Sequence, residues 1–278
     1  MPITSPANVF QESNTARNSR RTTSIVLALM SALVLGGCSL FGEKSDPTAK
    51  WSAQRLYDEA KSALQNGDYE TAVDLYEKLE SRYPFGPLAQ QAQLDVAYAY
   101  YKYDEPASAI AAADRFIKLH PQSENVAYML YLKGLTNSNK GIGFFERYFP
   151  KDPARRDVGP SLDAFRNFEE LVQRFPNSKY TEDANQRMLF LRNVVSEHEL
   201  HVAKYYLRRR AYVAAVNRAK YILENYQTSP VVPDALTVMA KSYKIMGFDD
   251  LSADALRVLE LNFPGHEGID SVRELELG

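Results

Sequence analysis

A pattern of small and apolar positions recurs in five segments of the chain, and each segment ends at an aromatic residue or a histidine followed by proline or glutamine. A small residue opens each pattern, and further packing residues follow four and seven positions later. The small residues are Ala72, Ala109, Ala164, Ala215 and Ser252. These spacings place side chains on one face of an α-helix, and proline ends a helix. The pattern predicts helices at 69–84, 106–121, 161–176, 212–227 and 249–264.

A second apolar pattern with helical spacing precedes these segments. In the last repeat it runs through Leu236, Met239, Ala240 and Tyr243. Two antiparallel helices repeating about every 34 residues, with small residues where the helices cross, are typical of tetratricopeptide repeats. Glycine is sparse and β-branched alternation is missing, so strands are not expected. The pattern predicts an all-α fold, a right-handed tetratricopeptide-repeat superhelix of five helix pairs.

Two repeats are longer than the others. Repeat three carries an insertion at 139–159, where glycines and prolines favour a loop with short turns. Repeat four gains its length from a long first helix, which the apolar spacing predicts from Thr181 to about Arg208.

The N-terminus has the three parts of a secretory signal. Arginines precede an uncharged run at 22–35, and Leu35, two glycines and Cys38 follow. The run of about 14 residues is shorter than the ~20 that a membrane-spanning helix needs. Leucine and two glycines before cysteine resemble a bacterial lipobox, in which the cysteine is lipidated; an ordinary signal peptide or a buried helix are the alternatives. Cys38 is the only cysteine of the chain, so it forms no disulfide within it.

These signals divide the chain into six segments. We expect a lipoprotein signal peptide at 1–37, a lipidated flexible tether at 38–50, N-terminal repeats with the first helix of repeat three at 51–138, an insertion loop at 139–159, C-terminal repeats at 160–264 and an acidic flexible tail at 265–278. Three acyl chains on Cys38 would hold the protein on its membrane, since stable anchoring takes at least two such signals. Ser39 after the cysteine favours the outer membrane.

Composition and motifs argue against several functions. A net charge of −2 lacks the basic patch that nucleic-acid binding requires. His198 and His201, with Glu197 and Glu199, could suggest zinc, but the histidines are three residues apart and the sequence offers no third ligand. The glycines at 141–143 lack the third glycine of a nucleotide fingerprint. No nucleophile is paired with a base, so we expect no enzyme, no metal and no cofactor.

In the first helices of the first three repeats, a second set of side chains lies on the face opposite the packing residues. In repeat two, Val96, Ala97 and Tyr100 are expected to pack, which places Leu94 on the opposite face. The same register exposes Tyr57, Lys61, Tyr98, Tyr101, Lys102, Tyr128 and Tyr131. This stripe either lines a concave substrate groove, as solenoids often provide, or packs between neighbouring repeats. Aromatic side chains with a few cations suit an extended peptide that ends in an aromatic residue and a carboxylate.

Several longer motifs resemble the BamD family of outer-membrane assembly lipoproteins. They are the residues at 83–87, 93–102, 114–117, 134–137, 176–178 with Tyr180, and 213–218. The resemblance covers nearly all of the mature chain. It implies a non-enzymatic subunit of the β-barrel assembly machine, on the periplasmic face of the outer membrane.

The resemblance also implies partners. The N-terminal repeats would receive unfolded outer-membrane β-barrel proteins, and the C-terminal repeats would hold the barrel-forming subunit, beside accessory lipoproteins. Arg218 would contact that subunit, and its place off the packing positions predicts that it is free to do so. The alternative is a lipoprotein adaptor of the same fold that tethers cell-wall enzymes.

Overall fold

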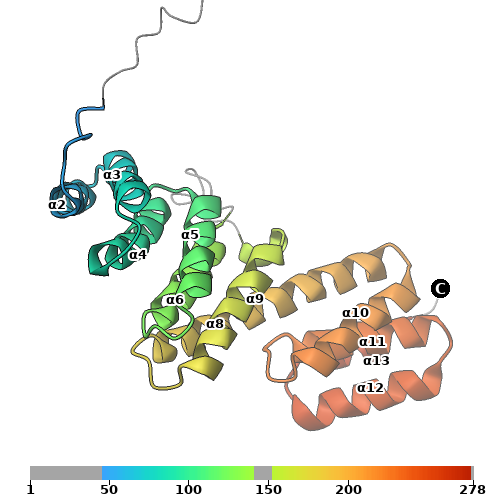
Figure 1. Cartoon of the computed structure of the whole chain (residues 1–278). Coiled ribbons are helices and arrows are strands. Elements are labelled where there is room, and N and C mark those ends of the chain that lie inside the picture. The colour runs from blue at the N-terminus through green and yellow to red at the C-terminus, as the bar shows by residue number, and fades with distance from the viewer. Residues whose placement is uncertain (1–45, 141–151, 277–278) are drawn as a thin grey trace, which may run out of the picture. The chain divides into compact units, whose positions relative to one another are not determined.

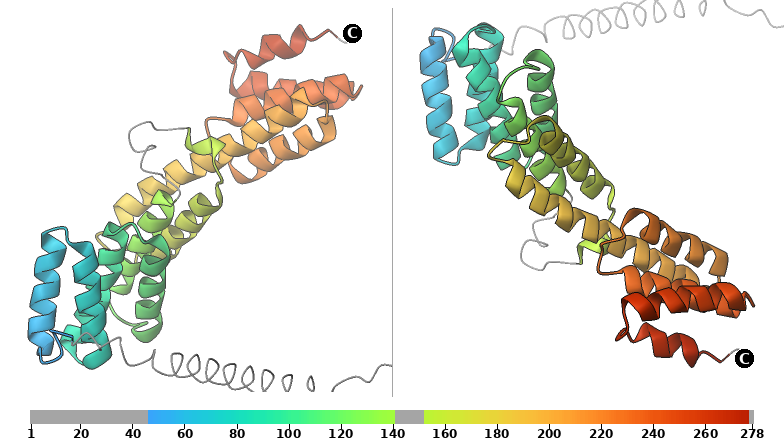
Figure 2. Two further views of the ribbon diagram at one scale, coloured as in Figure 1. Left: turned by 90° about the horizontal axis from the view of Figure 1, so that it is seen from above. Right: turned by 90° about the horizontal axis from the view of Figure 1, so that it is seen from below.

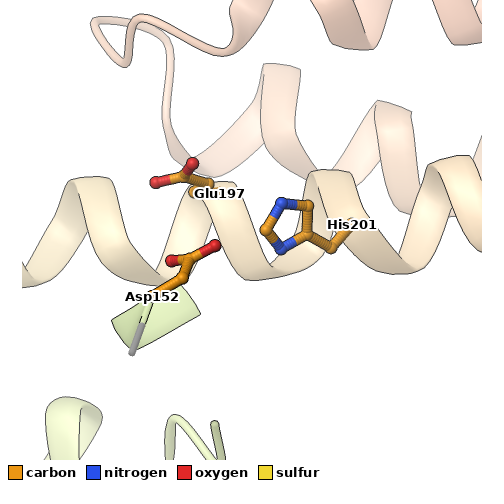
Figure 3. A group of neighbouring side chains, drawn as sticks. All are labelled: Asp152, Glu197 and His201. Carbon is orange, nitrogen blue, oxygen red and sulfur yellow. The ribbon is translucent and has the colours of Figure 1, made fainter. Parts of the chain in front are cut away.

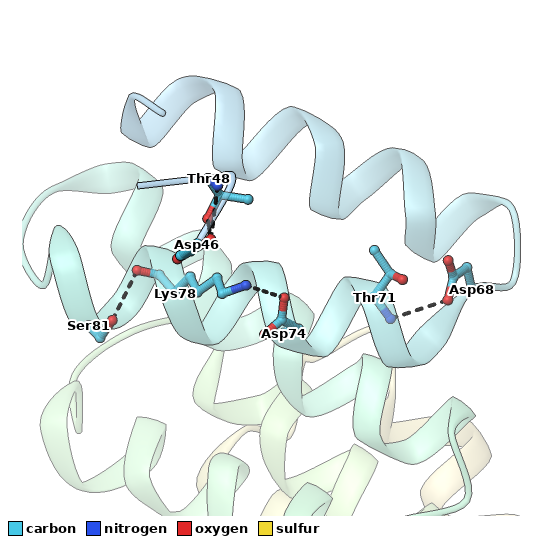
Figure 4. Close-up of polar contacts among 7 residues, drawn as sticks. All are labelled: Asp46, Thr48, Asp68, Thr71, Asp74, Lys78 and Ser81. Carbon is cyan, nitrogen blue, oxygen red and sulfur yellow. Dashed lines mark hydrogen bonds and ion pairs between the residues drawn. The ribbon is translucent and has the colours of Figure 1, made fainter. Parts of the chain in front are cut away.

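The computed structural model describes residues 46–140 and 152–276. The chain divides into two units, Met1–Trp51 and Ser52–Gly278. In the described part of the first unit, the carboxylate of Asp46 accepts hydrogen bonds from the backbone and the hydroxyl of Thr48 (Figure 4). The predicted signal peptide and Cys38 lie outside the described residues.

The second unit consists of helices that follow one another in antiparallel pairs (Figures 1 and 2). The pairs are α2 (Ala53–Gln65) with α3 (Tyr69–Arg82), α4 (Pro87–Lys102) with α5 (Pro106–Leu119), α6 (Val126–Asn139) with α8 (Gly159–Arg174), α9 (Thr181–Arg208) with α10 (Tyr212–Asn225), and α11 (Val232–Ile245) with α12 (Asp249–Asn262). The described residues form no strand, and the all-α fold of five helix pairs is confirmed. Within the same ranges, no helix has the length and apolar character needed to cross a membrane.

Each second helix ends as its sequence predicts. The residue before each proline or glutamine donates its backbone N–H to the carbonyl four residues earlier, at 2.8 Å in all five cases: Tyr83, His120, Phe175, Tyr226 and Phe263. At the other end of α3, the side chain of Asp68 accepts from the backbone N–H of Thr71 at 3.2 Å (Figure 4). Such caps satisfy backbone groups that a helix end leaves unpaired.

The helix crossings contain the predicted small residues. Ala72, Ala109, Ala164 and Ala215 are at most 1% exposed, and Ser252 is 6% exposed. At the crossing of α6 with α8, the larger side chain of Phe168, one turn after Ala164, fills the adjacent space. A Cβ atom on Gly134 of α6 would lie 2.4 Å from the ring of Phe168, so this crossing admits no side chain at all.

The insertion of repeat three begins where α6 ends, at Asn139. Its described part contains the 3₁₀ turn η2 (Pro153–Arg155), which packs on α9. Nδ1 of His198 on α9 hydrogen-bonds to the carbonyl of the buried Ala154 at 2.8 Å. The predicted long helix of repeat four is confirmed as α9.

The range 265–278 differs from its prediction as a flexible tail. It contains the short helix α13 (Gly268–Arg273), whose Ile269 and Val272 are buried against α11 and α12. Lys244 of α11 donates hydrogen bonds to the carbonyls of Val272 and Arg273. Two apolar side chains and a cation at its C-terminal end are enough to dock this segment, although the surrounding sequence is acidic.

Candidate binding site on the first helices of the repeats

The seven predicted groove residues lie on the first helices of three successive repeats. Tyr57 and Lys61 are on α2, Tyr98, Tyr101 and Lys102 are on α4, and Tyr128 and Tyr131 are on α6. Helix α4 packs against both α2 and α6, so these residues belong to one continuous surface. We call it the tyrosine face.

Asp95 of α4 organises the α2 end of the tyrosine face. Its Oδ2 accepts hydrogen bonds from the hydroxyls of Tyr57 at 2.9 Å and Tyr76 at 3.4 Å, and its Oδ1 accepts from the amide of Gln91 at 3.1 Å. Lys61 donates to the Tyr57 hydroxyl at 3.2 Å and lies over its ring. Hydrogen bonds to an ionised acceptor are stronger than neutral ones, so the phenol of Tyr57 is held in place.

Burial and Asp95 keep these phenols protonated. Burial raises the pKa of Tyr57, and the neighbouring carboxylate adds to the effect because it repels a phenolate. The pKa of the fully buried Tyr76 is raised for the same reasons. The hydrogen bond to Tyr57 raises the pKa of Lys61, which therefore stays charged. This end of the face therefore carries protonated phenols, both bonded to Asp95, beside the cation of Lys61.

The middle of the face is aromatic and more open. The side chain of Tyr98 is 36% exposed, and its ring lies 6.3 Å from that of Tyr101. The Tyr101 hydroxyl accepts a hydrogen bond from Asn139 of α6 at 3.0 Å, which links two repeats. Lys102 is exposed and lies over the ring of Tyr69 in the adjoining helix α3.

A second carboxylate fixes the α6 end of the face. Tyr131 donates to Asp183 of α9 at 2.6 Å, and Arg187 donates to the same oxygen at 2.5 Å. The hydrogen bond from Arg187 lowers the pKa of Asp183. The ring of Tyr131 stacks on Tyr180, with centroids 4.8 Å apart, and Tyr128 contacts Tyr180 at 5.7 Å. Burial raises the pKa of Tyr128.

A cavity of about 600 Å³ adjoins this aromatic end. The turns at 122–125 and 174–180 line it, and Tyr128 and Tyr180 form part of its wall. Lys179 contributes a cation, and its ammonium lies 5.1 Å from the centre of the Tyr180 ring. Aromatic walls with a nearby cation suit an apolar or aromatic side chain followed by an acidic group.

The face is neither fully open nor fully packed. Tyr57 is only 8% exposed, so it packs between repeats, whereas Tyr98 and Lys102 are exposed. Leu94 was expected on the open side, and that expectation is wrong, since it is 5% exposed. Helix α4 has neighbours in both adjoining repeats, so apolar residues are buried on more than one of its faces.

Three residues that position the tyrosines were missed as site residues: Asp95, Tyr180 and Asp183. Asp95 lies between the buried Leu94 and Val96, and an acidic residue inside an apolar helical run was the available signal. Tyr180 and Asp183 lie at the start of α9, outside the three helices that the register compared.

Arg218 on α10, which was expected to be free to face a partner protein, is already paired within the chain. Its guanidinium donates to Oε2 of Glu199 on α9 at 2.9 Å. The Arg218 side chain is 47% exposed, whereas that of Glu199 is 12% exposed. A partner protein could therefore approach Arg218, but it would meet an existing ion pair.

Comparisons with known proteins show the family to which the chain belongs. The family model described as "YfiO: Outer membrane lipoprotein" matches residues 49–259. A relative from Neisseria meningitidis serogroup B, named outer membrane protein assembly factor BamD, is 45% identical over 86% of this chain and 91% of its own length. Relatives with the same name from Vibrio cholerae and Xylella fastidiosa are 38% and 35% identical, over 84% and 87% of this chain and over 96% and 82% of their own lengths.

Proposed function

Because the chain belongs to the YfiO family of outer membrane lipoproteins, the family of the BamD assembly factors, we propose that it is a scaffold subunit of the β-barrel assembly machine. In this role it binds unfolded outer-membrane β-barrel proteins and also the barrel-forming subunit. The observation that carries the proposal is the tyrosine face, a preorganised aromatic surface shared by three successive repeats.

The chemistry of the tyrosine face supports binding of extended barrel segments. Such segments alternate apolar and polar side chains and are rich in aromatic residues near the membrane interfaces. Tyr98, Tyr101 and Tyr128 offer ring faces to these side chains, while Lys61 and Lys102 offer cations to a terminal carboxylate. Because Asn139 already bonds to Tyr101 and Tyr180 already contacts the ring of Tyr128, less conformational entropy is lost on binding.

The C-terminal repeats are proposed to hold the barrel-forming subunit. Arg218 is the candidate contact, since a guanidinium can pair with a carboxylate through two parallel hydrogen bonds. Its side chain is 47% exposed, so a partner's carboxylate could join Glu199 around it. In this proposal the pair with Glu199 orients Arg218 before the partner arrives.

The two proposed sites can be separated by mutation. Arg218→Glu should weaken the complex with the barrel-forming subunit, because it places a second negative charge beside Glu199, and should leave binding of a barrel C-terminal peptide unchanged. Tyr98→Ala with Tyr101→Ala should do the reverse. Affinity is measured by pull-down from detergent-solubilised membranes and by peptide titration.

Each test variant has a matched control on or next to the same helix. Lys220→Glu reverses another charge on α10, and Tyr103→Ala removes another exposed tyrosine at the end of α4. Neither control should affect either interaction. Equal impairment of both interactions by both test variants, with the fold intact, would reject the two-site arrangement. Recovery of a peptidoglycan hydrolase in place of a barrel-forming subunit would instead favour an adaptor for cell-wall enzymes.

A lipid anchor on Cys38 is proposed to place the protein on the periplasmic face of the outer membrane. Support comes from the lipobox-like residues before Cys38 and from the lipoprotein family to which the chain belongs. Cys38→Ser should therefore fractionate away from the outer membrane or remain unprocessed. Normal outer-membrane fractionation of this variant would contradict the anchor.

A further inference from the structure

Three potential metal ligands from two parts of the chain converge beside η2 (Figure 3). Glu197 and His201 lie one turn apart on α9, and Asp152 immediately precedes η2. One ligand atom from each of the three lies within 4.8 Å of the others. Figure 3 shows the imidazole of His201 facing the two carboxylates.

His201 has a free ligand atom. Its Nδ1 is buried and has no hydrogen-bond partner among the residues that the structure describes. A buried polar atom without a partner costs about 1–3 kcal/mol, so such an atom calls for an explanation. His198 differs, since its Nδ1 is already bonded to the carbonyl of Ala154 and holds η2 against the helix.

We propose that Asp152, Glu197 and His201 bind one divalent transition-metal ion of the Zn²⁺ class. Imidazole nitrogen with carboxylate oxygens is a ligand set that Zn²⁺ accepts, and three protein ligands leave a fourth position for water. The bound ion joins η2 to α9 and reinforces the contact that His198 makes. The sequence could not show this site, because its third ligand, Asp152, comes from the insertion.

The geometry requires only a small adjustment. Ligands about 2.0–2.2 Å from a tetrahedral zinc ion lie roughly 3.5 Å from one another. Glu197 is exposed, so rotation of its side chain can close the remaining distance. Imidazole and carboxylate ligands also distinguish this site from an all-oxygen site for Ca²⁺ or Mg²⁺.

One neighbour opposes the ion. Nε of Arg155 donates to Oδ2 of Asp152 at 3.2 Å, and the backbone N–H of Ala154 donates to Oδ1 at 3.0 Å. The Arg155 side chain is 74% exposed, and exposed ion pairs contribute about 0–1 kcal/mol, so a metal ion can displace it. Removing Arg155 should therefore tighten metal binding, whereas removing a ligand should weaken it.

The test uses the full-length chain in detergent, purified without a polyhistidine tag, and titrates Zn²⁺ against a chromogenic chelator. Wild type should bind one equivalent, and Glu197→Gln and His201→Gln should each bind at least tenfold more weakly. Arg155→Gln should bind more tightly than wild type. The visible spectrum of Co²⁺ in place of Zn²⁺ reports the coordination geometry.

Controls separate this site from loose surface binding. His266→Gln removes a histidine far from the cluster in sequence and should bind as wild type does. Glu197 is exposed, so its replacement should leave the helical circular dichroism unchanged. Wild-type affinity in both ligand variants, or the absence of a bound equivalent in wild type, would overturn the proposal. Neither outcome bears on the tyrosine face or on Arg218.

Discussion

The N-terminal and C-terminal repeats share their packing but differ in what links neighbouring first helices. In the N-terminal repeats, Tyr57 of α2 and Tyr131 of α6 are ordered by the carboxylates of Asp95 and Asp183. Between α9 and the C-terminal repeat, the links are the Ser196–Ser229 hydroxyl contact at 2.6 Å and the ion pair of Lys204 with Asp234 at 2.9 Å. The same type of helix pair therefore carries an aromatic surface in the N-terminal repeats and small polar contacts in the C-terminal repeats.

The crossings explain how this difference is tolerated. Ala109 in the N-terminal repeats and Ala215 in the C-terminal repeats are equally buried. Side chains at the crossings set the distance between two helices. Side chains on the other faces of the helices can differ between repeats without changing that distance. The fold and the proposed binding function thus involve different positions of the same helices, and each can be tested separately.

The largest effect is expected from enlarging a crossing residue. Ala109→Leu and Ala215→Leu should each lower the free energy of unfolding by about 1–3 kcal/mol, because overpacking displaces a helix. Repeat arrays gain stability from contacts between neighbours. Hydrogen exchange should therefore show the loss near α5 for the first variant and near α10 for the second.

A matched control exists within α5. Ala111 is exposed, two residues from Ala109, and Ala111→Leu should change stability by less than about 0.5 kcal/mol. Equal destabilisation by both leucines would mean that the helix register is wrong. Loss of protection across all repeats in either variant would mean that the two regions unfold as one.

The next largest effect is expected from breaking a polar link, and the loss of stability should differ between the two regions. Asp95→Asn should cost about 1–2 kcal/mol, since hydrogen bonds to charged groups contribute about 1.5–3 kcal/mol and asparagine keeps one acceptor. Arg218→Gln should cost about 0–1 kcal/mol, because that pair is half-exposed. Urea denaturation measures both. A larger loss of unfolding free energy in Arg218→Gln than in Asp95→Asn would contradict the expected difference between the two regions.

The fold could be predicted from the sequence because its determinants are local. Alanine at the crossing and proline at the helix end lie in the same helical segment, as Ala109 and Pro121 do, twelve residues apart. Helix α13 was missed because two apolar side chains, Ile269 and Val272, dock it in an otherwise polar segment. Six residues are too few for a helical period to stand out.

The site was only partly predictable because its contacts are distant in sequence. The register identified Tyr57 and Tyr131, but not the carboxylates that order them. Tyr57 and Asp95 are 38 residues apart, and Tyr131 and Asp183 are 52 residues apart. Asp152 and His201 are likewise far apart in the sequence, separated by α8 and the first part of α9, so no helical period connects them.

The smallest effect is expected from a buried carboxyl group within the N-terminal repeats. Glu80 of α3 pairs with Arg115 of α5 at 3.1 Å, and its Oε1 is buried without a hydrogen-bond partner among the described residues. Burial raises the pKa of Glu80, although Arg115 opposes this. The folded state therefore binds a proton more tightly than the unfolded state does, where the pKa is about 4.3.

This difference gives Glu80 a defined influence on stability. Between the unfolded pKa and the raised folded pKa, the folded chain binds more protons, so stability falls as pH rises through that window. Glu80→Gln should remove this decline, whereas Glu70→Gln, at an exposed site on the same helix, should keep it. Asp183 should act in the opposite sense, because its pKa is lowered and its contribution is lost as pH falls. Melting temperatures of the three proteins from pH 4 to 7 measure the slope, and an unchanged slope in Glu80→Gln would show that Glu80 is not its source.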